Sequence, residues 1–157
     1  MSWNVIRGSR GSEERAVKRS AGAPSRTHDD RIKVLVVDDE PAICKALSIA
    51  FGRVGFEVLT TQSGESAQQL LAAQRVDALV LDLRIPDMRG DVIYHLAVGM
   101  QPHLAGQTLF LTGDVSERAQ RLIAACGCHF LTKPFQLNDV IEAIRALVPR
   151  RHSSASA

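Results

Sequence analysis

The sequence is poor in aromatic residues and cysteines, and it contains no long apolar run. Phe, Trp and Tyr together make up 4% of the 157 residues, so we expect a core built from Val, Leu, Ile and Ala. No stretch approaches the ~20 consecutive apolar residues that a membrane-spanning helix needs, and the N-terminal segment lacks the apolar run of a signal peptide. These absences argue against a membrane protein and predict a cytoplasmic location.

The three cysteines are too few and too clustered for a disulfide framework. Two of them, Cys126 and Cys128, precede His129 in a pattern that resembles part of a metal site. The second pair of ligands that a zinc site needs is missing at the usual spacing. We therefore expect small core thiols and no structural disulfide.

The net charge of +2 is distributed unevenly along the chain. Residues 1–31 carry seven basic and four acidic residues, whereas residues 32–149 carry ten basic and thirteen acidic ones. The first segment has no sustained hydrophobic period, so we expect a disordered basic arm at 1–31 and a short disordered tail at 149–157. The arm has little net charge and no recognition motif, so neither nucleic acid nor a membrane is expected as a partner.

Between these ends, short apolar runs alternate with amphipathic segments. Strands apolar on both faces, separated by helices, are typical of a parallel sheet covered on both sides. The sequence therefore predicts a doubly wound α/β domain over residues 32–148, with five strands in the order 2-1-3-4-5 and five helices. We expect strands at 33–37, 56–60, 78–82, 108–112 and 129–132, and helices at 41–53, 64–75, from about 91, at 116–126 and at 138–147.

Acidic residues end two strands that are neighbours in this strand order. Asp38, Asp39 and Glu40 follow the first strand, and Asp82 ends the third. Helix capping could explain the first group alone and a turn could explain Asp82 alone. Their joint position at the switch point, where doubly wound sheets bind ligands, favours a magnesium site, because a cluster of carboxylates repels itself without a cation.

The fourth and fifth strands end in residues suited to binding a phosphoryl group. Thr112 ends the fourth strand, and Lys133 follows the fifth. A hydroxyl, an ammonium and a metal ion together match the three oxygens of a phosphoryl group. The same edge of the sheet is therefore predicted to bind phosphoryl.

Four motifs in order, VVDDE (36–40), LDLRIPDMRG (81–90), LFLTGD (109–114) and FLTKPF (130–135), carry a family resemblance. The sequence resembles the receiver domains of two-component response regulators, which have a flavodoxin- or CheY-like fold, over residues 32–148. The segment from MRGDVIYHL through QPHLAGQ to LFLTGD is most similar to receivers associated with hybrid histidine kinases.

The resemblance implies that Asp82 is the phospho-acceptor of a histidine kinase or histidine phosphotransfer protein. It implies a Mg²⁺ ion held by Asp38, Asp39, Asp82 and the backbone carbonyl of Arg84. Lys133 would contact a phosphoryl oxygen and precede a cis peptide bond to Pro134, a state that for X–Pro costs only ~0.5–1 kcal/mol.

Thr112 and Phe130 match the family's switch positions, and the signal would appear on the face of the fourth helix, fifth strand and fifth helix. The resemblance therefore implies a signalling module rather than an enzyme. Such a module could form a homodimer when it is phosphorylated. About eight residues follow the last helix, too few for a DNA-binding module, so we expect a stand-alone receiver.

Arg84 and Asp114 lie two residues beyond Asp82 and Thr112, respectively. Our hypothesis is that they pair and shield the aspartyl phosphate.

Three alternatives remain open at this point. A phosphate-independent pseudo-receiver would act purely as an interaction module. A small Mg²⁺-dependent phosphohydrolase also uses strand-end carboxylates, but the chain leaves no room for a cap domain. A flavin or nucleotide binder of the same fold is disfavoured because the acidic DDEPA follows the first strand, where a Gly- or Thr-rich loop would be needed.

Overall fold

The structure, a computed structural model, describes residues 30–150. Most of the predicted arm (1–31) and tail (149–157) lies outside these residues. The strands are β1 (Lys33–Val37), β2 (Glu57–Thr61), β3 (Ala78–Asp82), β4 (Thr108–Thr112) and β5 (His129–Thr132). The helices are α1 (Pro41–Arg53), α2 (Gly64–Ala73), α3 (Gly90–Met100), α4 (Glu117–Cys126) and α5 (Leu137–Leu147), with a short 3-10 helix η2 (Pro102–Gly106) after α3.

The five strands form one parallel sheet in the order β2-β1-β3-β4-β5, which confirms the predicted topology. β1 lies between β2 and β3, so the chain places β2 on one side of β1 and β3 on the other. Val37 at the end of β1 is in register with Leu81, and Asp82 is in register with Leu111 of β4. The carboxyl ends of all five strands therefore gather at one edge of the sheet.

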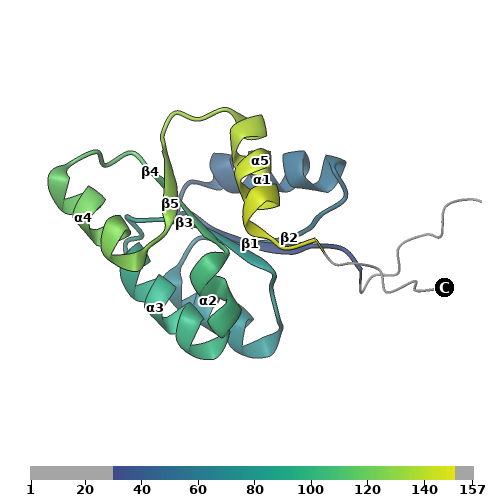
Figure 1. The fold of residues 1–157 in the computed structure, drawn as a ribbon, viewed down its shortest axis with the longest axis horizontal. Coiled ribbons are helices and arrows are strands. Elements are labelled where there is room, and N and C mark those ends of the chain that lie inside the picture. The colour runs from purple at the N-terminus through teal and green to yellow at the C-terminus, as the bar shows by residue number, and fades with distance from the viewer. Residues whose placement is uncertain (1–29, 151–157) are drawn as a thin grey trace, which may run out of the picture. The chain divides into compact units, whose positions relative to one another are not determined.

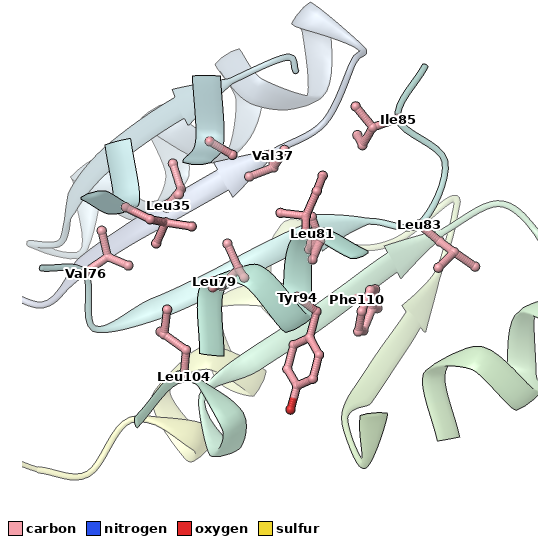
Figure 2. Packing of buried hydrophobic residues seen from close by; sticks show 14 of the residues in the cluster. Leu35, Val37, Val76, Leu79, Leu81, Leu83, Ile85, Tyr94, Leu104 and Phe110 are labelled. Carbon is pink, nitrogen blue, oxygen red and sulfur yellow. The ribbon is translucent and has the colours of Figure 1, made fainter. Parts of the chain in front are cut away.

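Two hydrophobic cores cover the two faces of the sheet. Figure 1 shows α1 and α5 on one face, and α2, α3 and α4 on the other. Side chains alternate between the faces along each strand. Leu35 and Leu81 join Phe110 in the core beneath α2, α3 and α4 (Figure 2), whereas Val36 and Val80 face α1 and α5. This two-sided burial explains why the strands are continuously apolar in sequence.

Close packing fixes the loop between β3 and α3 at both ends. A Cβ at Gly90 would lie 2.3 Å from the carbonyl oxygen of Asp82, so α3 begins against the end of β3 at a position that only glycine can occupy. Within the loop, the Asp87 carboxylate accepts hydrogen bonds from the backbone N–H groups of Gly64 (2.8 Å) and Glu65 (3.0 Å) at the start of α2. These two donors lower the pKa of Asp87.

A polar network closes the amino edge of the sheet. The side chain of Gln101, just after α3, is buried. Its oxygen accepts the Val76 N–H at 3.0 Å, and its nitrogen donates to the carbonyls of Leu71 and Gln74, each at 2.9 Å. Gln101 thus ties the end of α2 and the start of β3 to the turn after α3.

The cysteines agree only in part with the expected core thiols. All three are free, and Cys44 is buried in the core. Cys126 and Cys128 are half-buried at the edge of the other core, because Cys126 ends α4 and Cys128 lies directly before the exposed strand β5. None of the helices within residues 30–150 is long and apolar enough to cross a membrane.

Candidate functional site

The structure brings together three of the carboxylates that the sequence places at strand ends. Asp38 follows β1 and is 2% exposed, and Asp82 at the end of β3 is 6% exposed. Asp39 lies beside them and is half-buried. One carboxylate oxygen from each of the three lies within 4.8 Å of the others. Hard oxygen ligands at this spacing suit a small divalent cation.

Lys133 supplies the positive charge of the cluster. Its backbone N–H donates to the Thr112 carbonyl at 2.9 Å, which extends the pairing of β4 and β5 by one residue. Its ammonium group donates to Asp38 (2.8 Å), Glu40 (2.9 Å) and Asp82 (3.0 Å). The peptide bond from Lys133 to Pro134 is cis, as the family resemblance implied.

Burial and charge shift two pKa values in this cluster. Burial raises the pKa of Asp38, and the charge of Asp82 adds to this effect, against the opposing hydrogen bonds from Lys133 and the Glu40 N–H. Burial acts to lower the pKa of Lys133, but its hydrogen bonds to the three carboxylates outweigh burial and raise it. Lys133 is therefore charged at neutral pH, and Asp38 binds a proton more readily than an ordinary aspartate.

The end of β4 is held by a chain of contacts through Asp114. The Thr112 hydroxyl is buried and accepts the Asp114 N–H at 3.0 Å. The Asp114 carboxylate accepts the Ser116 N–H at 2.9 Å and the Arg84 Nε–H at 3.0 Å. Hydrogen bonds from Ser116, followed by Arg84, lower the pKa of Asp114 to about 2. Arg84 and Asp114 thus pair as hypothesised from the sequence.

Most of these groups line a pocket of about 770 Å³ at the carboxyl edge of the sheet. Phe130 lies outside it, on the exposed strand β5, and is 41% exposed. The pocket combines acidic groups with the half-buried ammonium of Lys133, so it can hold a metal ion and an anionic group side by side. It is lined by Asp39, Glu40, Asp82, Arg84, Gly113, Asp114, Val115, Ser116 and Lys133.

Sequence reasoning gave two residues near the pocket no specific role. Glu40 belongs to the acidic group expected after the first strand, but its bond to Lys133 depends on where the long side chain of a residue that follows β5 points. The sequence assigns no role to Asp87, although its carboxylate binds the start of α2. The sequence shows that Asp87 is an acidic residue in the loop after Asp82. It does not show that its partner is the backbone N–H of Gly64, 23 residues earlier.

A family model described as the response regulator receiver domain matches residues 34–145. The chain belongs to this family. The match covers all five strands, except for the first residue of β1, and the site described above. As a receiver domain, the protein is a signalling module of two-component systems.

Curated relatives of this receiver domain include two proteins of Mycobacterium tuberculosis. The probable transcriptional regulatory protein TcrX is 34% identical over 85% of this chain and 54% of its own length. The transcriptional regulatory protein KdpE is 35% identical over 78% of this chain and 53% of its own length. The chain therefore spans about half the length of the curated relatives it matches.

Solved structures show the same fold. The Vibrio cholerae chemotaxis protein CheY4 matches with a TM-score of 0.68 and 27% identity, over 75% of this chain and 99% of that one. A CheY-like receiver domain from Methanospirillum hungatei matches with a TM-score of 0.69 and 21% identity, over 74% of this chain and 92% of that one. The predicted likeness to receivers associated with hybrid histidine kinases stays a prediction.

Proposed function

We propose that this receiver domain accepts a phosphoryl group on Asp82 and works in the cytoplasm. The donor is the phosphohistidine of a histidine kinase or a histidine phosphotransfer protein. The observation that carries the proposal is the position of Asp82: it ends β3 in the pocket, with the Lys133 ammonium 3.0 Å from its carboxylate. A carboxylate can act as a nucleophile toward phosphorus when nearby positive charge offsets the charge of the incoming oxygens.

The donor set fits Mg²⁺, since Asp38, Asp39 and Asp82 offer hard oxygen ligands that converge on one point. We assign the metal to these three side chains and to the backbone carbonyl of Arg84. When bound, Mg²⁺ would offset negative charge on the carboxylates and on the phosphoryl oxygens. The same fold holds a phosphorylated aspartate and a calcium ion in a Burkholderia pseudomallei response regulator, with 23% identity, a TM-score of 0.66, and coverage of 72% of this chain and 66% of that one.

The transfer itself needs one bond to form and one to break. A carboxylate oxygen of Asp82 bonds to phosphorus as the phosphorus–nitrogen bond of the phosphohistidine breaks, and the electron pair leaves with the imidazole. Lys133 places its ammonium against a phosphoryl oxygen and keeps its charge because its pKa is raised. The product is an aspartyl phosphate, with Asp82 as the modified residue.

The output follows from a shift between two arrangements of the residues beyond the pocket. The Thr112 hydroxyl exchanges its bond with the Asp114 N–H for one to the phosphoryl group. Phe130, now exposed, turns inward into the space that Thr112 leaves. The changed surface is the α4-β5-α5 face, which would bind a downstream protein or a second phosphorylated copy.

Intact mass spectrometry after incubation with acetyl phosphate tests the proposal, with and without Mg²⁺, on the wild type and on Asp82→Asn. We expect one phosphoryl adduct that requires both Mg²⁺ and Asp82. Absence of an adduct under excess donor would show instead that the domain is a pseudo-receiver that acts without phosphate.

A further inference from the structure

The three N–H groups of the Lys133 ammonium are all engaged by carboxylates. They donate to Asp38, Glu40 and Asp82 at 2.8, 2.9 and 3.0 Å. A lysine ammonium has three donors, so Lys133 has no N–H left for an additional acceptor. Any phosphoryl oxygen that Lys133 contacts must therefore replace one of these carboxylates.

Of the three acceptors, Glu40 is the one that the fold can most easily release. Its side chain is 57% exposed, against 2% for Asp38 and 7% for Asp82. Glu40 is the N-cap residue of α1, but its side chain makes no capping hydrogen bond, and Pro41 follows it. Its backbone N–H bonds the Asp38 carboxylate at 2.9 Å, a contact that does not involve its own carboxylate. The Glu40 carboxylate is thus held at the pocket by Lys133 and is not needed to start the helix.

We propose that Glu40 is a positioning residue that restrains the Lys133 ammonium before phosphoryl transfer and slows transfer from small anionic donors. This inference rests on the proposed function of Asp82. Releasing Glu40 gives one Lys133 N–H to a phosphoryl oxygen while the bond to Asp38 is kept. The Glu40 carboxylate also lines the pocket, where its charge opposes the approach of an anionic donor.

The rate of adduct formation from acetyl phosphate at saturating Mg²⁺ tests this role. We expect Glu40→Gln and Glu40→Ala to form the Asp82 adduct about two- to five-fold faster than the wild type, the range for a partly exposed ion pair. The alanine variant should be the faster of the two, because a glutamine oxygen can still accept a hydrogen bond from Lys133. The gain should persist in about 0.5 M salt, which screens distant charges but not a direct contact.

Glu65→Gln is the matched control, because it removes the same charge from an exposed residue in the first turn of α2, outside the pocket. Its rate should stay close to that of the wild type. An equal gain in Glu65→Gln, or no gain in either Glu40 variant, would overturn the inference. If the wild type forms no adduct on Asp82, the proposed function itself is rejected.

A second measurement reads the restraint without phosphorylation. The chain contains four lysines, so the ammonium signal of Lys133 can be assigned in a heteronuclear NMR spectrum by comparison with Lys133→Arg. Three hydrogen bonds should slow hydrogen exchange of this ammonium in the wild type, and Glu40→Ala should speed it. Equal exchange rates in the two proteins would show that Glu40 does not restrain Lys133.

Discussion

The buried polar side chains at the two edges of the sheet have different kinds of partner. At the amino edge, Gln101 is buried and all its polar atoms are bonded to backbone groups. At the carboxyl edge, Asp38 and Asp82 are equally buried, but they lie beside each other and share the charge of Lys133. The amino edge therefore contributes to stability, whereas the carboxyl edge keeps like charges together at a cost in stability.

The contrast follows from the kind of partner each edge uses. Backbone N–H and carbonyl groups are fixed by the fold and cannot leave, so a buried amide that binds them is satisfied once the chain has folded. Side-chain ion pairs can exchange partners, which a ligand-binding edge requires. Substitutions at the two edges should separate effects on folding from effects on chemistry.

The largest effect on stability is expected at the amino edge. Gln101→Ala removes the acceptor of the Val76 N–H and the donor to the Leu71 and Gln74 carbonyls, and the buried N–H is left without a partner. A buried unsatisfied polar group costs roughly 1–3 kcal/mol, so we expect the free energy of unfolding to fall by about 3 kcal/mol once the lost bonds are included. Urea denaturation followed by circular dichroism measures this change.

Gln69→Ala, on the exposed surface of α2, provides the control and should change stability by less than about 0.5 kcal/mol. The folded fraction of Gln101→Ala should still form the Asp82 adduct with acetyl phosphate. A stable Gln101→Ala protein would show that the amino edge is not the stabilising one.

The sequence predicted the carboxyl edge far better than the amino edge. Alternating apolar and amphipathic segments predict a parallel sheet, and the predicted strand order places the ends of β1 and β3 side by side. The sequence alone therefore predicts that Asp38 and Asp82 lie close together. The prediction was less accurate at element ends: β2 begins at Glu57, one residue later than predicted, and α2 ends at Ala73, two residues earlier than predicted.

Gln101 and η2 were not predicted, for a physical reason. The segment QPHLAGQ has no hydrophobic period and contains Pro102 and Gly106, so its sequence does not indicate a helix. The partners of Gln101 are backbone groups at the end of α2 and before β3, and backbone partners leave no mark in the sequence. The bond between Glu40 and Lys133 was not predicted either, because it depends on the rotamers of two long side chains.

The second prediction concerns the pH dependence of stability without Mg²⁺. The raised pKa of Asp38 means that the folded state binds this proton more tightly than the unfolded chain, whose value is near 3.8. The free energy of unfolding should therefore fall as pH rises from 3.8 through the folded pKa of Asp38. The change should be smaller than that of Gln101→Ala, and urea titrations between pH 4 and 7, with a chelator present, would measure it.

Asp38→Asn removes this titration and should flatten the curve in that interval. Asp87 and Asp114 have lowered pKa values, so their contribution to stability is lost only as pH falls below about 3.8, outside the interval. A rise in wild-type stability between pH 4 and 7 would contradict the view that the carboxyl edge carries unfavourable charge.

The smallest effect on stability is expected for Arg84→Ala. This substitution should instead change the lifetime of the Asp82 phosphate. The Arg84 side chain is 74% exposed, and exposed ion pairs contribute little to folding, so the unfolding midpoint should barely change. If the pair with Asp114 shields the pocket from water, Arg84→Ala should shorten the lifetime of the Asp82 phosphate by about two- to five-fold, which mass spectrometry after donor removal can follow.

Arg121→Ala is the matched control, because Arg121 forms a similarly exposed pair with Glu117 on α4, away from the pocket lining. Its aspartyl phosphate should decay at the wild-type rate. Asp114→Ala should also shorten the lifetime, and Arg84→Ala should add nothing further in the Asp114→Ala background, because the contact between Arg84 and Asp114 is already lost there. An unchanged lifetime in Arg84→Ala would contradict the shielding role. A shortened lifetime at constant stability would show that a contact at the carboxyl edge can act on the chemistry without supporting the fold.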